Sequence, residues 1–175
     1  MMRASQNKIN LREIGIENWQ LWRKLRLDAL AEAPYAFSSK LADWQGEGDT
    51  EFRWRGRLSD VPLNIIAEWR ETAAGMTSAT APNLDGSVQL LSMWVAPFAR
   101  GHGVGDALVN SVIAWAREQQ ASRVALAVFK GNERAAALYR RHGFMEVGTA
   151  PATSPEIASE RKMVRVLSTV ATTRL

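Results

Sequence analysis

The most constraining feature of the sequence is an apolar strand that runs directly into a glycine-rich turn and then into a helix. Residues 90–95 are mostly apolar, and Pro97 ends the run. Residues 100–105 then read Arg-Gly-His-Gly-Val-Gly. Behind this turn, apolar side chains recur about every four residues, which predicts a helix with one buried face. They are Val104, Leu108, Val112 and Trp115.

A strand, a glycine turn and a helix N-terminus in this order predict an anion site. The first N–H groups of a helix have no intrahelical partner, and the helix dipole adds about half a positive charge. A pyrophosphate suits such a site. A dinucleotide fingerprint does not fit, because Asp106 stands where its third glycine belongs, and no Gly-Lys-Ser/Thr is present for a Walker loop. For these residues alone, a turn that binds nothing is an equally good interpretation.

A second motif lies about thirty residues further along, where residues 132–141 have the pattern of a helix that stops at Gly143. Asn132, Ala136 and Tyr139 are four and three residues apart, so they share one helix face. Taken alone, this pattern favours a helix N-cap at Asn132 and a buried tyrosine in the core.

Together the two motifs resemble the GNAT superfamily of N-acetyltransferases. The turn matches the family's R/Q-x-x-G-x-G/A loop, and residues 131–144 match N-x-x-A-x-x-L-Y-x-x-x-G-F. The resemblance covers residues 87–148, and it implies that this segment is an acetyl-CoA-binding core. Acetyl-CoA would then be the co-substrate, with Asn132 on its pantetheine arm and Tyr139 near the thioester sulfur. The implied pyrophosphate donors are the backbone amides of Arg100, Gly101, His102, Gly103, Val104, Gly105 and Asp106.

The resemblance also implies catalytic roles. A leaving thiol departs more easily with a positioned acid, so Tyr139 is expected to be the general acid. A backbone N–H near Trp94 or Val95 is expected to polarise the thioester carbonyl. Many family members place a glutamate on the strand before the glycine loop, but residues 90–95 hold no carboxylate.

The general base therefore stays open. Glu68 is a candidate that would act through water, and Glu32 is a weaker one. An ordinary solvated carboxylate is the more common role for such residues. A mechanism that uses bulk water as the base is equally open.

An acidic segment with interleaved aromatic residues is a candidate acceptor site. Asp43 and Glu47 lie beside Trp44, and carboxylates with aromatic faces suit a cationic amine. An exposed face with no specific role explains the same pattern somewhat better. Phe37 and Tyr35 are further candidates, as is the loop at residues 150–160.

The rest of the chain predicts one mixed α/β domain over residues 1–175, with residues 1–7 flexible. Strands are expected at residues 8–13, 62–69, 73–81, 87–95, 123–129, 144–147 and 162–167. Helices are expected at residues 16–32, in two pieces within 38–59, after the glycine turn, and at 132–141. The resemblance implies a mixed, mostly antiparallel central sheet of six to seven strands flanked by about four helices.

Composition excludes several classes. The chain has no cysteine, and its two histidines lack metal-ligand spacing, so no metal site is expected. No apolar run could span a bilayer, and the first residues do not form a secretory signal, which predicts a cytoplasmic protein without a membrane partner. Residues 87–175 hold 11 basic and 6 acidic side chains, which suits an anionic partner. The aromatic residues follow core spacing, which argues against nucleic acid as that partner.

The leading functional prediction is an N-acetyltransferase. It would transfer the acetyl group of acetyl-CoA to a primary amine of a small molecule by direct attack in a ternary complex. One alternative is a protein N-terminal or lysine acetyltransferase, and another is a non-catalytic acyl-CoA-binding module. Seven tryptophans also leave room for a homodimer interface.

Overall fold

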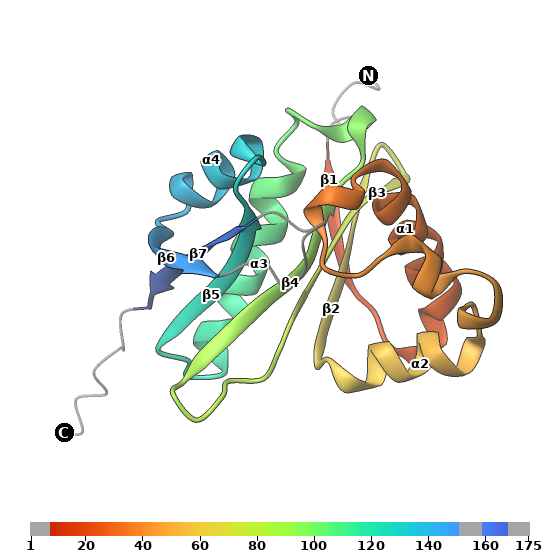
Figure 1. Cartoon of the computed structure of the whole chain (residues 1–175), viewed down its shortest axis with the longest axis horizontal. Coiled ribbons are helices and arrows are strands. Elements are labelled where there is room, and N and C mark those ends of the chain that lie inside the picture. The colour runs from red at the N-terminus through yellow and green to blue at the C-terminus, as the bar shows by residue number, and fades with distance from the viewer. Residues whose placement is uncertain (1–7, 151–158, 168–175) are drawn as a thin grey trace, which may run out of the picture.

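The computed structural model describes residues 8–150 and 159–167, which form seven strands and four α-helices (Figure 1). The strands are β1 (Ile9–Glu13), β2 (Leu63–Trp69), β3 (Thr72–Ala79), β4 (Ser87–Val95), β5 (Arg123–Phe129), β6 (Met145–Ala150) and β7 (Glu160–Val166). The helices are α1 (Trp19–Glu32), α2 (Glu51–Asp60), α3 (Val104–Glu118) and α4 (Glu133–Arg141). The predicted α/β fold class is confirmed.

All strands belong to one sheet with the order β1-β2-β3-β4-β5-β7-β6. Every neighbouring pair is antiparallel except β4 and β5, which run parallel. A short hairpin joins the antiparallel strands β2 and β3. The parallel strands β4 and β5 need a crossover connection, and α3 supplies it. The sheet is therefore mixed and mostly antiparallel, as expected.

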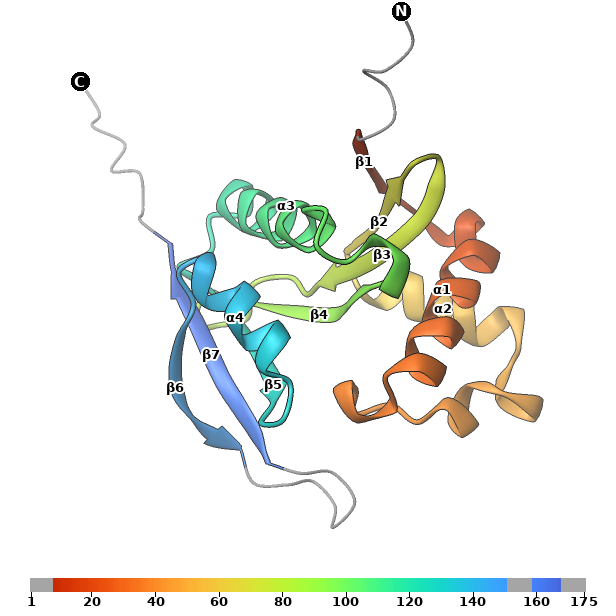
Figure 2. The ribbon, with the colours of Figure 1, turned by 90° about the horizontal axis from the view of Figure 1, so that it is seen from above.

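The helices cover both faces of the sheet. In Figure 2, α3 lies on one face, and α1 and α2 lie on the other. The residues of β2 alternate between two apolar clusters: Ile65 and Ala67 pack in the cluster with α3, and Ile66 packs in the cluster with α1 and α2. This is the two-residue period of a strand buried on both faces.

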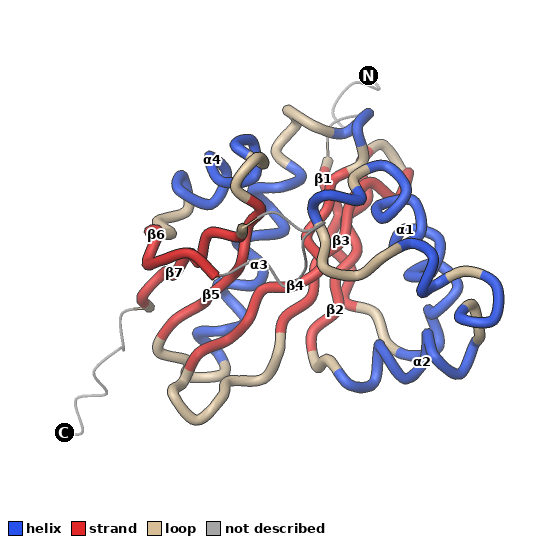
Figure 3. The backbone as a smooth tube through the Cα atoms, in the orientation of Figure 1, coloured by secondary structure: helices blue, strands red, loops and turns tan. Residues whose placement is uncertain are grey.

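Most predicted elements lie where the apolar patterns placed them (Figure 3). The predicted helix at residues 16–32 begins with a 3-10 turn at Ile16–Asn18, and α1 follows from Trp19. The region at 38–59 contains two 3-10 turns and α2 and is broken near Gly46 and Gly48, as predicted. Trp22 is fully buried, whereas Trp19 and Trp115 are only partly buried against the two clusters.

Some sequence-based expectations fall on residues that lie outside the described part of the chain. These are the flexible stretch at residues 1–7 and most of the loop at residues 150–160. Among the described residues, no helix combines the length and apolar character that a membrane crossing requires. The same residues contain no group of three or more His, Cys, Asp or Glu side chains arranged to hold a metal ion.

Candidate active site

The central feature of the site is a split in the sheet between β4 and β5. The two strands pair only at Ser87, Val88 and Gln89, and then they diverge. A β-bulge lies in β4 just beyond, where Ser92 adopts a φ of 53°. The divergence opens a cleft of about 810 Å³. Its walls include Met93, Trp94 and Val95 from β4, and Ala127 and Val128 from β5.

The glycine turn forms one end of this cleft. Gly101 and Gly103 have φ values of 78° and 85°, a left-handed conformation that side chains rarely adopt, and Gly103 is the N-cap of α3. A Cβ at Gly101 would meet no atom within 4 Å, so the backbone there is open to a ligand. The backbone at Gly101, just before the N-terminus of α3, is therefore exposed to the cleft without a covering side chain.

The turn residues do not all have the same role. Arg100, Gly101, Gly103, Gly105 and Asp106 line the cleft. A Cβ at Gly105 would lie 3.0 Å from a methyl carbon of Leu138, so this glycine also allows α3 to approach α4 closely.

Two residues of the turn have side chains outside the cleft lining. The ring of His102 stacks on Trp69 with centroids 4.2 Å apart, and the side chain of Val104 is buried in the core. Only their backbone amides are left as possible ligand contacts.

The second motif lines the opposite side of the cleft through α4. Asn132 is the N-cap, and its side-chain oxygen accepts a hydrogen bond from the Ala135 N–H at 3.2 Å. Asn132 nevertheless lines the cleft, as do Tyr139 and Leu138. The N-cap role and a ligand contact are compatible, because the cap uses the side-chain oxygen and leaves the amide nitrogen to donate.

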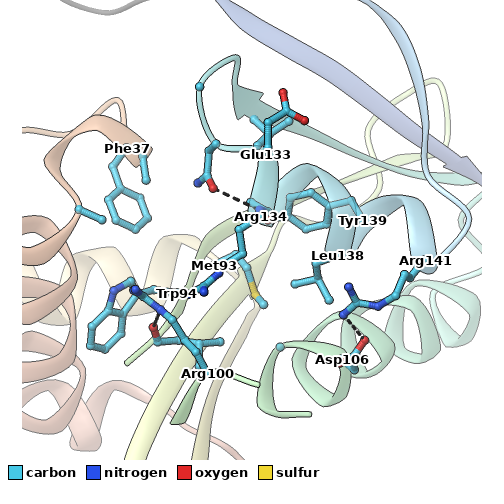
Figure 4. Close-up of a pocket in the computed structure, with 18 of the residues that line it drawn as sticks. Phe37, Met93, Trp94, Arg100, Asp106, Glu133, Arg134, Leu138, Tyr139 and Arg141 are labelled. Atoms are coloured by element: carbon cyan, nitrogen blue, oxygen red, sulfur yellow. Dashed lines mark hydrogen bonds and ion pairs between the residues drawn. The ribbon is translucent and has the colours of Figure 1, made fainter. Parts of the chain in front are cut away.

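Tyr139 is almost fully buried, with 5% of its surface exposed, and its ring packs edge-on against Phe144. Burial raises the pKa of its phenol above the usual value of 10.0. Tyr139 therefore stays protonated at neutral pH, and it contributes to the lining of the cleft. In Figure 4, Tyr139 and Phe37 come from opposite walls, and Arg134 lies between them.

A carboxylate, Glu32, is held at the edge of the cleft by two cleft residues. It accepts hydrogen bonds from Arg100 Nη2 at 2.7 Å and from the Trp94 indole N–H at 3.0 Å. The bond from Arg100, together with that from Trp94, lowers the pKa of Glu32 despite partial burial. A carboxylate held in this way is a poor proton acceptor.

The other predicted acidic residues lie away from the cleft. Glu68 is on β2, where its side chain accepts a hydrogen bond from Asn10 at 3.1 Å, and it does not line the cleft. Asp43, Trp44 and Glu47 do not line it either. Arg53 lies over the Trp44 ring at 4.4 Å and donates to the Asp43 carbonyl oxygen, so this segment packs on its own neighbours.

Several cleft residues were not among the predicted ones. Arg134, Met93, Leu138 and Arg141 line the cleft, while Tyr35 and Phe37 line it as anticipated. Arg134 could have been found, because it stands two residues after Asn132 in the second motif. Arg141 could not, because its position depends on how α4 packs beside α3, where it donates to Asp106 at 2.9 Å.

The split sheet, with a glycine turn and a helix N-terminus at the split, offers an anion site beside an apolar cleft, as an acyltransferase of the acyl-CoA-binding class would need. The model of the acetyltransferase (GNAT) family matches residues 22–144. The chain therefore belongs to the GNAT family, and it is an acyltransferase that uses acetyl-CoA as co-substrate. No curated protein sequence matches it.

Solved structures share the fold at low sequence identity. The acetyltransferase yncA from Salmonella typhimurium, solved with its cofactor acetyl-CoA, is 16% identical with a TM-score of 0.73, over 92% of this chain and 95% of that one. A chimeric spermidine N-acetyltransferase from Vibrio cholerae is 17% identical with a TM-score of 0.71, over 90% and 95% of the two chains. A ribosomal-protein-alanine N-acetyltransferase from Brucella melitensis is 23% identical with a TM-score of 0.67, over 90% and 99%.

The residues of the cleft fit acetyl-CoA. Open backbone at Gly101 and the N-terminus of α3 suit a pyrophosphate, and Arg100, Arg134 and Arg141 add positive charge to the cleft lining. The narrow part between β4 and β5 is lined by Met93, Val95 and other apolar groups, which suits an extended thioester arm.

Proposed function

We propose that this protein transfers the acetyl group of acetyl-CoA to the primary amine of a small molecule, by direct attack in a ternary complex. The observation that carries the proposal is the position of Tyr139, a buried and protonated phenol in the lining of the cleft between β4 and β5. Acetyl-CoA supplies an activated acetyl thioester, and the chain supplies the groups around it.

Binding and orientation come from three segments of the cleft. The backbone amides from Arg100 to Asp106 hold the pyrophosphate, and Asn132 donates to the pantetheine arm. A backbone N–H near Trp94 or Val95 polarises the carbonyl, since β4 has no paired strand on its β5 side beyond Gln89 in the described residues. Holding both reactants in one cleft supplies much of the rate by proximity.

Proton transfer is divided between a buried acid and solvent. The amine nitrogen forms a bond to the carbonyl carbon as the bond from that carbon to sulfur breaks. Tyr139 gives its proton to the departing sulfur, and the resulting phenolate takes up a proton from water, which balances the proton that the amine releases. The amine loses its proton to water, either directly or along a water chain that ends at Glu68, which does not touch the cleft.

A small acceptor is supported by the aromatic side chains at the acceptor end. Phe37, in the segment after α1, lies across the cleft from Tyr139 of α4 (Figure 4), and Tyr35 of the same segment also lines the cleft. A protein acceptor would bind in the same part of the cleft through its N-terminal residue or a lysine. The experiment below distinguishes a small-molecule acceptor from a protein acceptor.

The experiment is the release of coenzyme A thiol from acetyl-CoA with three acceptor sets: small primary amines, free amino acids, and short peptides with free N-termini. Turnover with a small amine or amino acid that exceeds turnover with every peptide supports the proposal. Turnover confined to peptides would replace it with a protein N-acetyltransferase. Binding of acetyl-CoA without any turnover would indicate the non-catalytic module.

A further inference from the structure

Three hydrogen-bond donors lie between the α1–α2 layer and the sheet, two of them buried and the third, on Arg57, partly buried. Trp22 and Arg26 are four residues apart on α1, and they are 0% and 8% exposed. The Trp22 indole N–H and Arg26 Nη1 have no hydrogen-bond partner among the described residues. Arg57 of α2 lies beside them, with its guanidinium carbon 5.4 Å from the centre of the Trp22 ring.

The partners of Arg57 are all uncharged. It donates to the Asn64 side-chain oxygen at 3.3 Å and to the hydroxyls of Ser78 and Ser92, each at 3.2 Å. Within the described part of the chain, neither Arg26 nor Arg57 forms an ion pair. Burial, and then the charge of Arg57, lowers the pKa of Arg26 to about 10.

Two adjacent guanidinium groups, one buried and one partly buried, that hydrogen-bond to no carboxylate of the described residues are unfavourable in an isolated fold, and the charge of Asp60 compensates only Arg57. Buried charges in proteins are paired, and a buried donor left without an acceptor costs its full desolvation. The cluster contains donors in excess and lacks an anionic acceptor. A ligand that carries an anion would satisfy it.

The cluster adjoins the acceptor end of the cleft. The guanidinium of Arg26 lies 4.5 Å from the centre of the Phe37 ring, and Phe37 lines the cleft. The hydroxyl of Ser92 accepts a hydrogen bond from Arg57. Ser92 is the bulge residue immediately before Met93, and Met93 lines the cleft. Only one side chain therefore separates these donors from the part of the cleft in which the acceptor would bind.

The carboxylates of the cleft are already engaged. Asp106 accepts from Arg141 and His142, Glu133 accepts from Arg161, and Glu32 accepts from Arg100. A polycationic acceptor would find no uncommitted carboxylate among these, whereas an anion would find Arg26 and Arg57.

We propose that the acceptor is a primary amine that also carries a carboxylate, and that Arg26, Arg57 and the Trp22 indole N–H receive this carboxylate. The proposal rests on the proposed function and narrows its substrate class to amino acids and related amino-carboxylates. None of the three donors lines the cleft, so the Phe37 side chain would turn aside to admit the carboxylate.

The test uses acceptors in matched pairs, each an amino acid and its carboxamide, with the full chain and saturating acetyl-CoA. We expect kcat/KM for the acid to exceed that for the amide by about tenfold or more, since charged hydrogen bonds are worth more than neutral ones. Arg26→Met and Arg57→Met should lower kcat/KM for the acid by about thirtyfold and leave the amide nearly unchanged. Arg57→Lys should prefer the acid over the amide more strongly than Arg57→Met does.

Arg55→Gln is the matched control, because Arg55 lies on the same helix but pairs with Glu51 on its exposed face. A second readout separates a ligand site from a structural role. Arg26→Met should raise the thermal midpoint of the free protein, because it removes an unpaired buried charge. A lower midpoint would show that Arg26 supports the fold.

Equal use of acid and amide by the wild type would overturn the proposal, as would an equal loss for both in the Arg26→Met variant. If no acceptor turns over, calorimetry measures whether the amino acids bind. Binding that is lost in Arg26→Met would then support the carboxylate site while contradicting the proposed function. Absence of binding would contradict both.

Discussion

At the scale of single residues, Tyr139 has the most direct link between environment and chemistry. Its phenol is buried in the lining of the cleft, and burial raises its pKa. We predict that Tyr139→Phe lowers kcat by about 100-fold, the usual size of a general-acid contribution. The affinity for acetyl-CoA should change little, because the ring and its packing on Phe144 are kept.

The measurement is kcat and acetyl-CoA affinity for both proteins between pH 6 and about pH 10. A phenol with a raised pKa stays protonated across this range, so ionisation of Tyr139 should not lower the wild-type kcat. Unchanged turnover in the Tyr139→Phe variant would remove Tyr139 as the acid.

The sequence predicts the relative positions of residues best where one helix contains the whole pattern. The spacing of Asn132 and Tyr139 within α4 places both on one face without knowledge of any other element, and both line the cleft. Glu68 and Glu47 were selected for their charge, and neither reaches the cleft. Their positions depend on how β2 and the segment before α2 pack, which a single sequence does not specify.

At the scale of elements, the proposed binding of the co-substrate depends on the junction of β4 and α3. The bounds of β4 and β5 follow the sequence pattern closely, because each is an apolar run ended by Pro97 or by the turn at Gly131. Their divergence after Gln89 has no such signature. It depends on how the strands pair and on the bulge at Ser92, which the apolar pattern does not reveal.

We predict that Gly103→Glu abolishes acetyl-CoA binding. The substitution places a negative charge and a side chain at the N-cap of α3, against the expected pyrophosphate. Acetyl-CoA at about 100 times its dissociation constant should stabilise the wild type by about 2.7 kcal/mol, or about 5–10 °C, and the variant not at all.

Gly103→Ala is the control for backbone strain. It imposes the same cost of a positive φ without the charge, and a Cβ at this position would come no closer than 3.6 Å to Ile9. The alanine variant should keep most of the thermal shift. A folded Gly103→Glu protein that keeps the full shift would refute the assignment of the glycine turn.

At the scale of the whole molecule, the sheet separates two apolar clusters, and the one beside α1 and α2 is also tied together by polar contacts. Asp49 accepts hydrogen bonds from Arg23 of α1, at 2.6 Å from Nε, and from the indole N–H of Trp54 in α2, at 2.8 Å. These bonds, that from Arg23 first, lower the pKa of Asp49 to about 2. One carboxylate therefore joins the two helices that also hold Arg26 and Arg57.

The lowered pKa makes this contact a pH-dependent part of the molecule's stability. An unfolded aspartate has a pKa of about 3.9, so the folded state favours the ionised form at every pH above that value. The contribution is complete above about pH 5 and is lost as the pH falls through about 2. We predict that Asp49→Asn lowers the midpoint at pH 7 by about 3–6 °C, corresponding to about 1–2 kcal/mol. The difference from wild type should narrow steadily below pH 4, because protonated Asp49 in the wild type then resembles the amide. Thermal unfolding followed by circular dichroism at pH 7, 4, 3 and 2 measures this.

Asp28→Asn is the control, since Asp28 forms only an exposed pair with Lys24 on α1 and should shift the midpoint little. A difference for Asp49→Asn that stays constant from pH 7 to pH 2 would show that Asp49 acts through packing rather than through its charge.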